Sequence, residues 1–564
     1  MHPLNNRTRF TLIACALGAL VMTADCDGGC SCGGEAKLVI PATPVERVNA
    51  CASHLPSQTD LALFFTEMDG VRSSVDVLSK RFSGSLPVDA YRAEVQTLVG
   101  VDLLDKTTYA QAGIHADAGF CVAVYRETPL LLLYVTDADK FRGHAIASIR
   151  KYYRVTAEPS EVAPGRWRID ADGLDLAWER LPSGLTAVVF GSAGKRKAPR
   201  PSVDVLAEIV AVEADSSLGS VEAFGTYRDT VAVRWPASIY MNTPRLLSFY
   251  KSFDPSLKGY QKEVIDAVGE QIRWTGVGWK ADGAAAQGQA FFGVNPETLA
   301  KVEGLENPGK RSPRFHRMVG DDAYLFVRTG VDAALFWKEY QALMPERQRK
   351  YVQRIFKNLK ASTQIDLEKD VIQNATGNVG IAIYGVQPVL FGARRAVERM
   401  QAVSFVAMIQ LSDPQGFSGI LDRIIGELGG AIRREGLPGG IIRYGFDPNS
   451  STAPPFAIFM KDDVATLATT TVDTETVRNL LSGESPALHK KVASDAARTL
   501  FEADKATGLY VNMPKVREKI SVLGAGLINS LLGPQREIVV QLSLTPHGIA
   551  ADATIALEAE GAAP

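Results

Sequence analysis

The chain has 564 residues, of which 46% are hydrophobic and 22% are charged. This composition is typical of globular proteins with substantial cores, and the length predicts two to four domains. A net charge of -2 and a pI near 6.4 leave no broad basic surface. We therefore expect no nucleic acid among its partners.

Residues 1–34 have the features of a targeting segment and tether. Arg7 and Arg9 precede an uncharged, mostly apolar run, Phe10–Ala24. This run suits a signal peptide but is short for a membrane-spanning helix, which needs about 20 residues. No later stretch is long enough to cross a bilayer, so we expect a soluble body.

Cys26 follows the apolar run and precedes a Gly-rich stretch. This order resembles a bacterial lipoprotein signal, and the resemblance implies that Cys26 is lipidated and becomes the mature N-terminus. Thr23 and Asp25 depart from the leucine and the small residue usual in such signals. Simple cleavage near Ala24 and an uncleaved anchor therefore remain open. The predicted location is the cell envelope, membrane-anchored and facing the periplasm or the cell exterior.

The body contains two cysteines, Cys51 and Cys121. In an oxidising compartment they can form a disulfide, but two separate buried thiols fit the sequence equally well. Cys30 and Cys32, in the tether, are separated by one residue and have no histidine or second cysteine pair nearby. That spacing is unlike a metal site, so we predict neither a metal nor a cofactor.

Short apolar runs rich in Val, Ile, Phe and Tyr predict strands, and apolar residues at helical spacing predict helices between them. The expected strands are Leu61–Phe65, Phe120–Tyr125, Leu130–Val135, Ala232–Arg234, Phe405–Leu411, Ile538–Leu544 and Ile549–Leu557. The expected helices are Val71–Phe82, Leu335–Leu343, Val352–Leu359, Ile420–Ile432 and Val516–Leu532.

Several short patterns recur in the same order in the two halves of the chain, which predicts an internal duplication. The matched starts are Asp60 and Asp322, Asp102 and Asp366, Gly113 and Gly377, Asp137 and Asp413, Tyr240 and Tyr510, and Gly283 and Gly548. The expected domains are a 35–56 linker, a first repeat at 57–300, a basic Pro/Gly linker at 301–317, a second repeat at 318–558 and a 559–564 tail.

Consecutive strands without crossover helices favour antiparallel sheets. The predicted fold class is therefore α+β, with two diverged copies of a unit whose helices pack on one face of the sheet. Asp102 with Leu103 and Asp105, and Asp366 with Leu367 and Asp370, each precede a glycine and a hydrophobic strand. This pattern resembles an uncharacterised family of secreted bacterial proteins with a domain of unknown function, a resemblance that implies no active site.

Repeated polar residues offer the only candidates for catalysis. Asp102, Asp366, Asp137 and Asp413 could act as carboxylate catalysts, but an Asp before a helix or turn more often caps free backbone N–H groups. Asn242 and Asn512 precede prolines closely and favour turns in the same way. The seven histidines form no motif with metal-ligand spacing, and no GxSxG sequence occurs. We expect no catalytic residues.

The leading hypothesis is a non-enzymatic envelope lipoprotein that acts as a binding or scaffold module, with an envelope protein as its partner. The alternative is a periplasmic carrier of a lipid or another apolar ligand. A hydrolase with dispersed active-site residues is the third reading. A continuous apolar cavity would favour the carrier, whereas a cleft with convergent ionisable groups would favour the hydrolase. The sequence places no ligand-binding site on particular residues.

Overall fold

The computed structural model divides the chain into two compact units, which are described separately here. Unit 1 contains residues 1–295 and 547–550, and unit 2 contains residues 296–546 and 551–564. The described residues are 40–82, 101–102, 105–153, 156–171, 174–191, 200–253, 259–305, 313–344, 346–386, 402–427, 432–446, 456–502, 507–522 and 535–558. Among them, no helix has both the length and the apolar character needed to span a bilayer.

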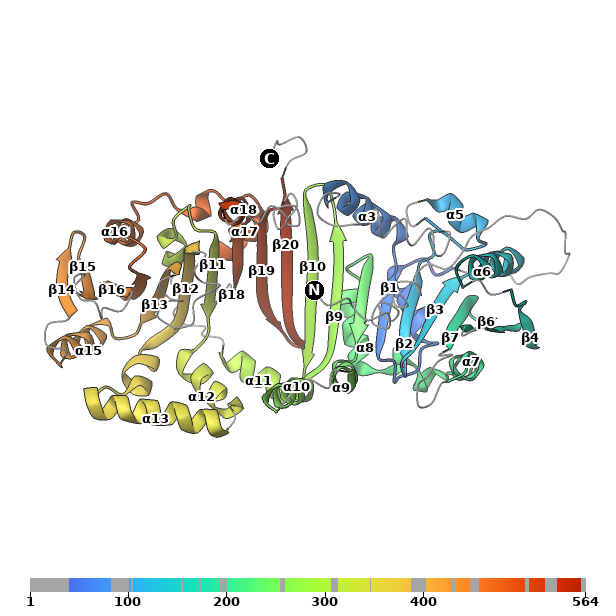
Figure 1. Cartoon of the computed structure of the whole chain (residues 1–564), viewed down its shortest axis with the longest axis horizontal. Coiled ribbons are helices and arrows are strands. Elements are labelled where there is room, and N and C mark those ends of the chain that lie inside the picture. Colours follow the sequence, from blue (N-terminus) through green and yellow to red (C-terminus); the bar gives the residue numbers. More distant parts are fainter. Residues whose placement is uncertain are drawn as a thin grey trace. The chain divides into compact units, whose positions relative to one another are not determined.

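Unit 1 is built on an antiparallel sheet with the strand order β4-β5-β6-β7-β3-β2-β1-β8-β9-β10 (Figure 1). The strands are β1 (Leu61–Phe65), β2 (Phe120–Tyr125), β3 (Thr128–Tyr134), β4 (Ser160–Ala163), β5 (Arg166–Ala171), β6 (Leu174–Arg180), β7 (Leu185–Gly191), β8 (Ala237–Met241), β9 (Ile272–Ala281) and β10 (Ala285–Val294).

Helices cover both faces of this sheet, where one face was expected. Along β3, Leu130 and Leu132 lie in one core cluster with α2, α7 and α8, whereas Leu131 and Leu133 lie in a second cluster with α3, α5 and α6. A strand buried on both faces has a continuous apolar run rather than alternation. The helices are α2 (Pro44–Ala52), α3 (Met68–Phe82), α5 (Lys106–Gln111), α6 (Ala138–Tyr153), α7 (Ser202–Val210), α8 (Glu222–Tyr227), α9 (Thr243–Phe253) and α10 (Tyr260–Gln271).

Unit 2 has a second antiparallel sheet with the order β14-β15-β16-β17-β13-β12-β11-β18-β19, and β20 pairs with β19. Its strands are β11 (Leu325–Gly330), β12 (Ala375–Val386), β13 (Val403–Leu411), β14 (Ile432–Leu437), β15 (Ile441–Phe446), β16 (Phe456–Lys461), β17 (Val464–Thr469), β18 (Thr507–Asn512), β19 (Gln535–Thr545) and β20 (Gly548–Leu557), whose first three residues belong to unit 1.

Unit 2 also has helices around its sheet, and its strand order repeats that of unit 1 position by position. The helices are α11 (Pro296–Leu305), α12 (Ala333–Leu343), α13 (Glu346–Thr363), α15 (Pro414–Glu427), α16 (Thr474–Ser482), α17 (Asp495–Glu502) and α18 (Met513–Val522). The predicted α+β class with antiparallel sheets is thus confirmed. In both units, two strands of the sheet lead directly into a helix: β1 and β8 in unit 1, and β11 and β18 in unit 2.

Backbone hydrogen bonds show which residues occupy equivalent positions. Asn242 donates its N–H to the Asp60 carbonyl oxygen, and Asn512 donates to the Tyr324 carbonyl oxygen, both at 2.9 Å. Asp60 is therefore equivalent to Tyr324 and not to Asp322, the residue matched by sequence. The sequence match is two residues out of register because apolar residues alternate along both strands and a two-residue slip preserves their pattern.

The glycine match shows a similar slip. Gly377 has a φ of 89°, and a side chain there would meet the Val331 carbonyl oxygen. The residue with this role in unit 1 is Gly119, with a φ of 76° and the Phe65 carbonyl oxygen in its way. Gly113, which the sequence paired with Gly377, instead lies against the Asp137 carbonyl oxygen. Both turns require a left-handed backbone, which glycine adopts at little cost.

Three local predictions are wrong. Ala232–Arg234 is not a strand: residues 228–232 form one turn of π-helix, and β8 begins at Ala237. The expected helix Ile420–Ile432 ends at Glu427, and Ile432 begins β14. The expected 35–56 linker contains α2. Thr43 and Glu46 form a capping box at the start of this helix, and Pro44 occupies its first helical position. A Thr followed directly by Pro, with Glu three residues after the Thr, is a sequence signature of a helix start.

Candidate ligand-binding site

The candidate site begins with helix α15 of unit 2, whose apolar residues Phe417, Leu421 and Ile424 recur at helical spacing. Asp413 caps its start, because Asp413 Oδ1 accepts a hydrogen bond from the Gly416 N–H at 2.8 Å. A helix with one apolar stripe turns that stripe toward a core. Here the stripe packs on strands at the outer end of the sheet.

Strands β14, β15 and β16 supply the other wall. Tyr444 of β15 lies directly across from Arg434 of β14 and Ile458 of β16. Side chains alternate between the two faces of a strand, so Tyr444 and Phe446 share a face. Both line the same space as Ile458 and Ile432.

Between this wall and α15 lies an apolar cavity of about 220 Å³. The described residues that line it are all aliphatic or aromatic: Leu421, Ile424, Ile425, Ile432, Tyr444, Phe446, Phe456 and Ile458. Apolar cavities of roughly 150 Å³ stay dry and accept small apolar molecules. This cavity lies below the roughly 300 Å³ typical of drug-sized ligands, so it suits one small apolar group.

One hydrogen bond joins the two walls. Ser418 Oγ and the Tyr444 hydroxyl oxygen lie 2.6 Å apart, so the helix and β15 are tied together where Tyr444 lines the cavity. The Tyr444 side chain is almost fully buried, with 3% of the residue exposed. Its ring can therefore contribute apolar surface to the cavity while its hydroxyl remains hydrogen-bonded.

The equivalent place in unit 1 is filled by larger side chains. Helix α6, capped by Asp137, covers β5 and β6, where Trp167 and Trp178 lie directly opposite each other. Both tryptophans belong to the core beneath α6. In unit 2 this cross-strand pair is Tyr444 and Ile458. The Arg142 guanidinium lies 4.8 Å from the Trp167 ring, just as Ser418 contacts Tyr444.

The repeated carboxylates are structural in this protein. Asp137 Oδ1 accepts hydrogen bonds from the Asp139 and Lys140 N–H groups, and Asp413 has the equivalent role at α15. Asp366 caps the π-helical turn 367–372 and pairs with Lys360 at 2.7 Å, which lowers the pKa of Asp366. In unit 1 the cap of α5 is Asp105 rather than the buried Asp102.

The repeated asparagines also act as expected. Asn242 Oδ1 accepts a hydrogen bond from the Arg245 N–H, and Asn512 Oδ1 accepts one from the Lys515 N–H, both at 3.4 Å. They stand at the starts of α9 and α18. The two distances are long for strong hydrogen bonds. The two bonds are therefore weak, but they occupy the same position in the two units.

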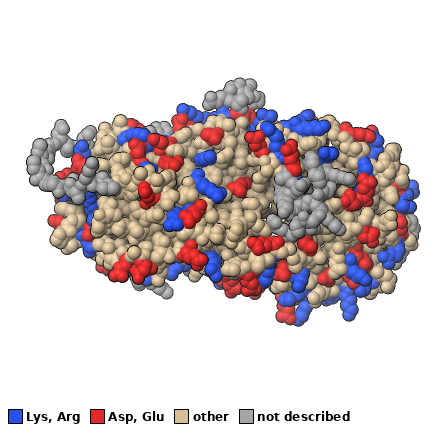
Figure 2. Space-filling model, turned by 180° about the vertical axis from the view of Figure 1, so that it is seen from behind, with Lys and Arg blue, Asp and Glu red and all other residues tan. Residues whose placement is uncertain are grey.

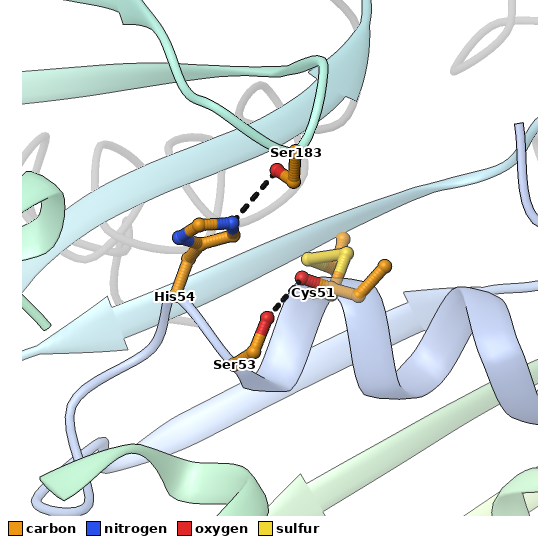
Figure 3. The surroundings of a disulfide bond; sticks show 6 residues. Cys51, Ser53, His54 and Ser183 are labelled. Atoms are coloured by element: carbon orange, nitrogen blue, oxygen red, sulfur yellow. Dashed lines mark hydrogen bonds between the residues drawn. A yellow bond between two sulfur atoms is a disulfide. The ribbon is translucent and has the colours of Figure 1, made fainter. Parts of the chain in front are cut away.

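Cys51 and Cys121 form a disulfide that ties α2 to β2 (Figure 3). The two Cα atoms lie 6.4 Å apart, and both residues are buried in the first core cluster. Next to it, His54 Nε2 and Ser183 Oγ point toward each other at 2.7 Å, joining the end of α2 to the turn between β6 and β7 (Figure 3). Burial lowers the pKa of His54. Cys26, Cys30 and Cys32 lie outside the described residues.

Unit 1 contains a network of four ion pairs. Asp69 and Asp117 each contact both Arg72 and Lys106 within 3.0 Å. The hydrogen bond to Asp69 raises the pKa of Lys106, and the reciprocal bond lowers that of Asp69. Within the described residues, no group of three or more His, Cys, Asp or Glu side chains could hold a metal ion.

No local sequence pattern predicts the cavity. Its lining comes from α15 and three strands, and their juxtaposition depends on pairings such as Tyr444 with Ile458 that no local pattern encodes. One signal was present: five of the six tryptophans lie before residue 280, and Trp337 is the exception. Of the five, Trp178 and Trp274 are buried.

No protein-family model matches the chain, and no curated protein matches it. Among solved structures, crystal forms IV, III and I of TP0453 are similar at 10%, 10% and 11% identity. They cover 45%, 45% and 43% of this chain and 84%, 86% and 78% of TP0453, with TM-scores of 0.24, 0.25 and 0.23. At such scores the similarity carries no argument about function.

Proposed function

We propose that this protein is a non-enzymatic binding protein of the cell envelope that takes an apolar group, such as the end of an acyl chain, into the cavity beneath α15. The observation that carries the proposal is the cavity itself: about 220 Å³, with a lining of aliphatic and aromatic side chains. Each methylene transferred there from water contributes about 0.8 kcal/mol. The lipid anchor at Cys26 remains a prediction and would keep the cavity near its ligand's membrane.

The comparison between units supports a dedicated cavity. Where unit 1 places Trp178 against α6, unit 2 has the smaller Ile458 at the equivalent position. We also infer that the two units descend from one duplicated ancestor, and the repeated strand order and equivalent Asp and Asn caps support this. In this account one copy kept a filled core and the other acquired a binding site.

A substitution taken from unit 1 tests the proposal. Ile458→Trp should fill the cavity and weaken binding of a fluorescent fatty acid by roughly tenfold or more. Ile458→Leu keeps the volume and should bind like the parent protein. The measurement is a fluorescence titration of residues 35–564.

Thermal unfolding of both variants shows whether each is folded. If the bulky Trp prevents folding, Leu421→Phe narrows the same cavity from the helix side. Equal affinity of the parent protein and a folded filling variant would overturn the proposal.

A further inference from the structure

Helices α12 and α13 of unit 2, called here the aromatic helix pair, expose an unusual share of large apolar side chains. The described residues include seven exposed large hydrophobic side chains, and four belong to this pair. Phe336 is 50% exposed, Tyr340 47%, Tyr351 57% and Ile355 44%. Single exposed apolar residues are normal, but a group of them marks an interaction surface.

A ring contact between the two helices uses other side chains. The Trp337 ring of α12 stacks on the Phe356 ring of α13, with 5.4 Å between centroids. Phe336 and Tyr340 lie one helical turn apart with nearly parallel rings, and Tyr351 and Ile355 have the same spacing on α13. Each helix therefore has an exposed apolar stripe besides its packing contacts.

The charge on α13 is almost entirely of one sign. In a chain whose net charge is -2, α13 contains a single acidic residue, Glu346, and six basic ones. Figure 2 shows Lys and Arg side chains projecting from the lower edge, where Figure 1 places α13. On the helical wheel, Arg354 lies about 60° from Tyr351 and Lys357 about 120°, both on the side of the stripe away from the partly buried Phe356.

Charge complementarity indicates what covers this surface. A second copy of the chain would bring one basic α13 against another, and like charges repel. A membrane with anionic headgroups satisfies both features, because basic side chains attract it and aromatic side chains enter its interface. Helix α13 is too rich in charge to span a bilayer but suits a position in its surface plane.

We propose that the aromatic helix pair docks unit 2 onto an anionic lipid membrane, with Tyr351 and Ile355 entering the interface and Arg354 and Lys357 contacting lipid phosphates. This surface is separate from the cavity beneath α15. The docking therefore does not depend on the proposed function, and Ile458→Trp should leave it unchanged.

The test is sedimentation of residues 35–564, which lack the predicted anchor, with vesicles of phosphatidylcholine alone or mixed with phosphatidylglycerol. The parent protein should bind only the anionic vesicles, and more weakly as salt rises. Arg354→Gln with Lys357→Gln should weaken binding roughly thirtyfold. Tyr351→Gln with Ile355→Gln should also weaken it, even at low salt.

Matched controls carry the same substitutions elsewhere. Lys80→Gln with Lys140→Gln removes two exposed charges from unit 1, and Val162→Gln with Leu542→Gln removes two exposed apolar side chains. Both should bind vesicles like the parent protein. Equal loss in the controls, absence of binding to anionic vesicles, or concentration-dependent dimerisation abolished by the Tyr351 and Ile355 changes would each overturn the proposal.

Discussion

The hydroxyl groups of Ser418 and Tyr444 lie 2.6 Å apart and join helix α15 to strand β15 beside the apolar cavity. The pair holds the two cavity walls at a fixed separation. In unit 1 the equivalent contact is between a cation and a ring, Arg142 over Trp167. The equivalent contacts thus lie beside a filled core in unit 1 and beside a cavity in unit 2.

Removing this hydrogen bond should affect stability more than ligand binding. Tyr444→Phe leaves the ring in the cavity wall and should lower the free energy of unfolding of unit 2 by about 1 kcal/mol. Ser418→Ala should cost a similar amount, and the double variant little more than either, because both lose one interaction. Urea unfolding measures all three, and additive losses would show that the two hydroxyls do not interact.

The Cys51–Cys121 disulfide should stabilise unit 1 considerably. It joins residues 70 positions apart, and closing a loop of that length contributes about 4 kcal/mol in the chain-entropy account. Cys51→Ala with Cys121→Ala should lower the urea midpoint of unit 1. Reduced parent protein should unfold at nearly the same urea concentration as this variant. A midpoint unaffected by reductant would contradict the disulfide.

Helix α17 lies between two buried charges of opposite sign. Glu537, 1% exposed, accepts hydrogen bonds from the N–H groups of Ala493 and Ser494, just before the helix starts, at 3.1 and 2.6 Å. Arg328, 4% exposed, donates to the carbonyl oxygens of Leu500 and Phe501 near its end, at 3.3 and 3.2 Å. Each charge complements the helix dipole at its own end.

Neutralising either charge should therefore destabilise unit 2. Glu537→Gln or Arg328→Met removes the charge-assisted hydrogen bonds at one end of α17 and leaves the backbone groups there with a weaker partner or none, at an expected cost of about 2 kcal/mol. Asp495→Asn is the control, since this carboxylate in the first turn of α17 is 92% exposed and should contribute less than about 0.5 kcal/mol. Chemical denaturation compares the three, and equal losses would contradict a role for burial.

His144 should make unit 1 sensitive to acid. The residue is fully buried in α6, and burial lowers its pKa to about 2, from 6.5 for the free side chain. Between these values the unfolded chain binds a proton at His144 that the folded chain does not. Stability is thus complete above about pH 6.5 and falls with decreasing pH, by up to about 1.4 kcal/mol per pH unit.

Replacing His144 should remove that part of the pH dependence. His144→Leu should flatten the slope of unfolding free energy against pH between pH 6 and pH 4, whatever its effect at neutral pH. His547→Gln, at an exposed position, serves as the control for replacing a histidine. Parallel slopes for the parent protein and His144→Leu would show that His144 titrates normally in the folded chain.

Local patterns predicted many elements but not their surroundings. Leu61–Phe65 and Phe120–Tyr125 are strands with the expected bounds, since β-branched and aromatic residues in short runs suit a sheet. The two-sided burial of Leu130–Leu133 was missed, although an unbroken apolar run indicates it. Ile432 was predicted to be helical because a short apolar segment fits both the helical and the strand spacing of apolar residues.

The candidate site lay beyond sequence reasoning for a different reason. A cavity forms where the volume that the backbone encloses exceeds the volume of the side chains inside it. The exchange of a Trp178–Trp167 pair for an Ile458–Tyr444 pair becomes visible only when β5 with β6 and β15 with β16 are known to be equivalent. Sequence matching had already slipped by two residues at Asp60, so that equivalence needed the hydrogen-bond register.

Native mass spectrometry of residues 35–564, exported and purified without detergent, tests the central claim most directly. The account predicts a stoichiometric apolar ligand that survives purification, or that binds on addition of free fatty acid, and is lost in Ile458→Trp but kept in Ile458→Leu. An unchanged bare mass in the presence of excess fatty acid, or a ligand retained by the folded Ile458→Trp variant, would contradict it.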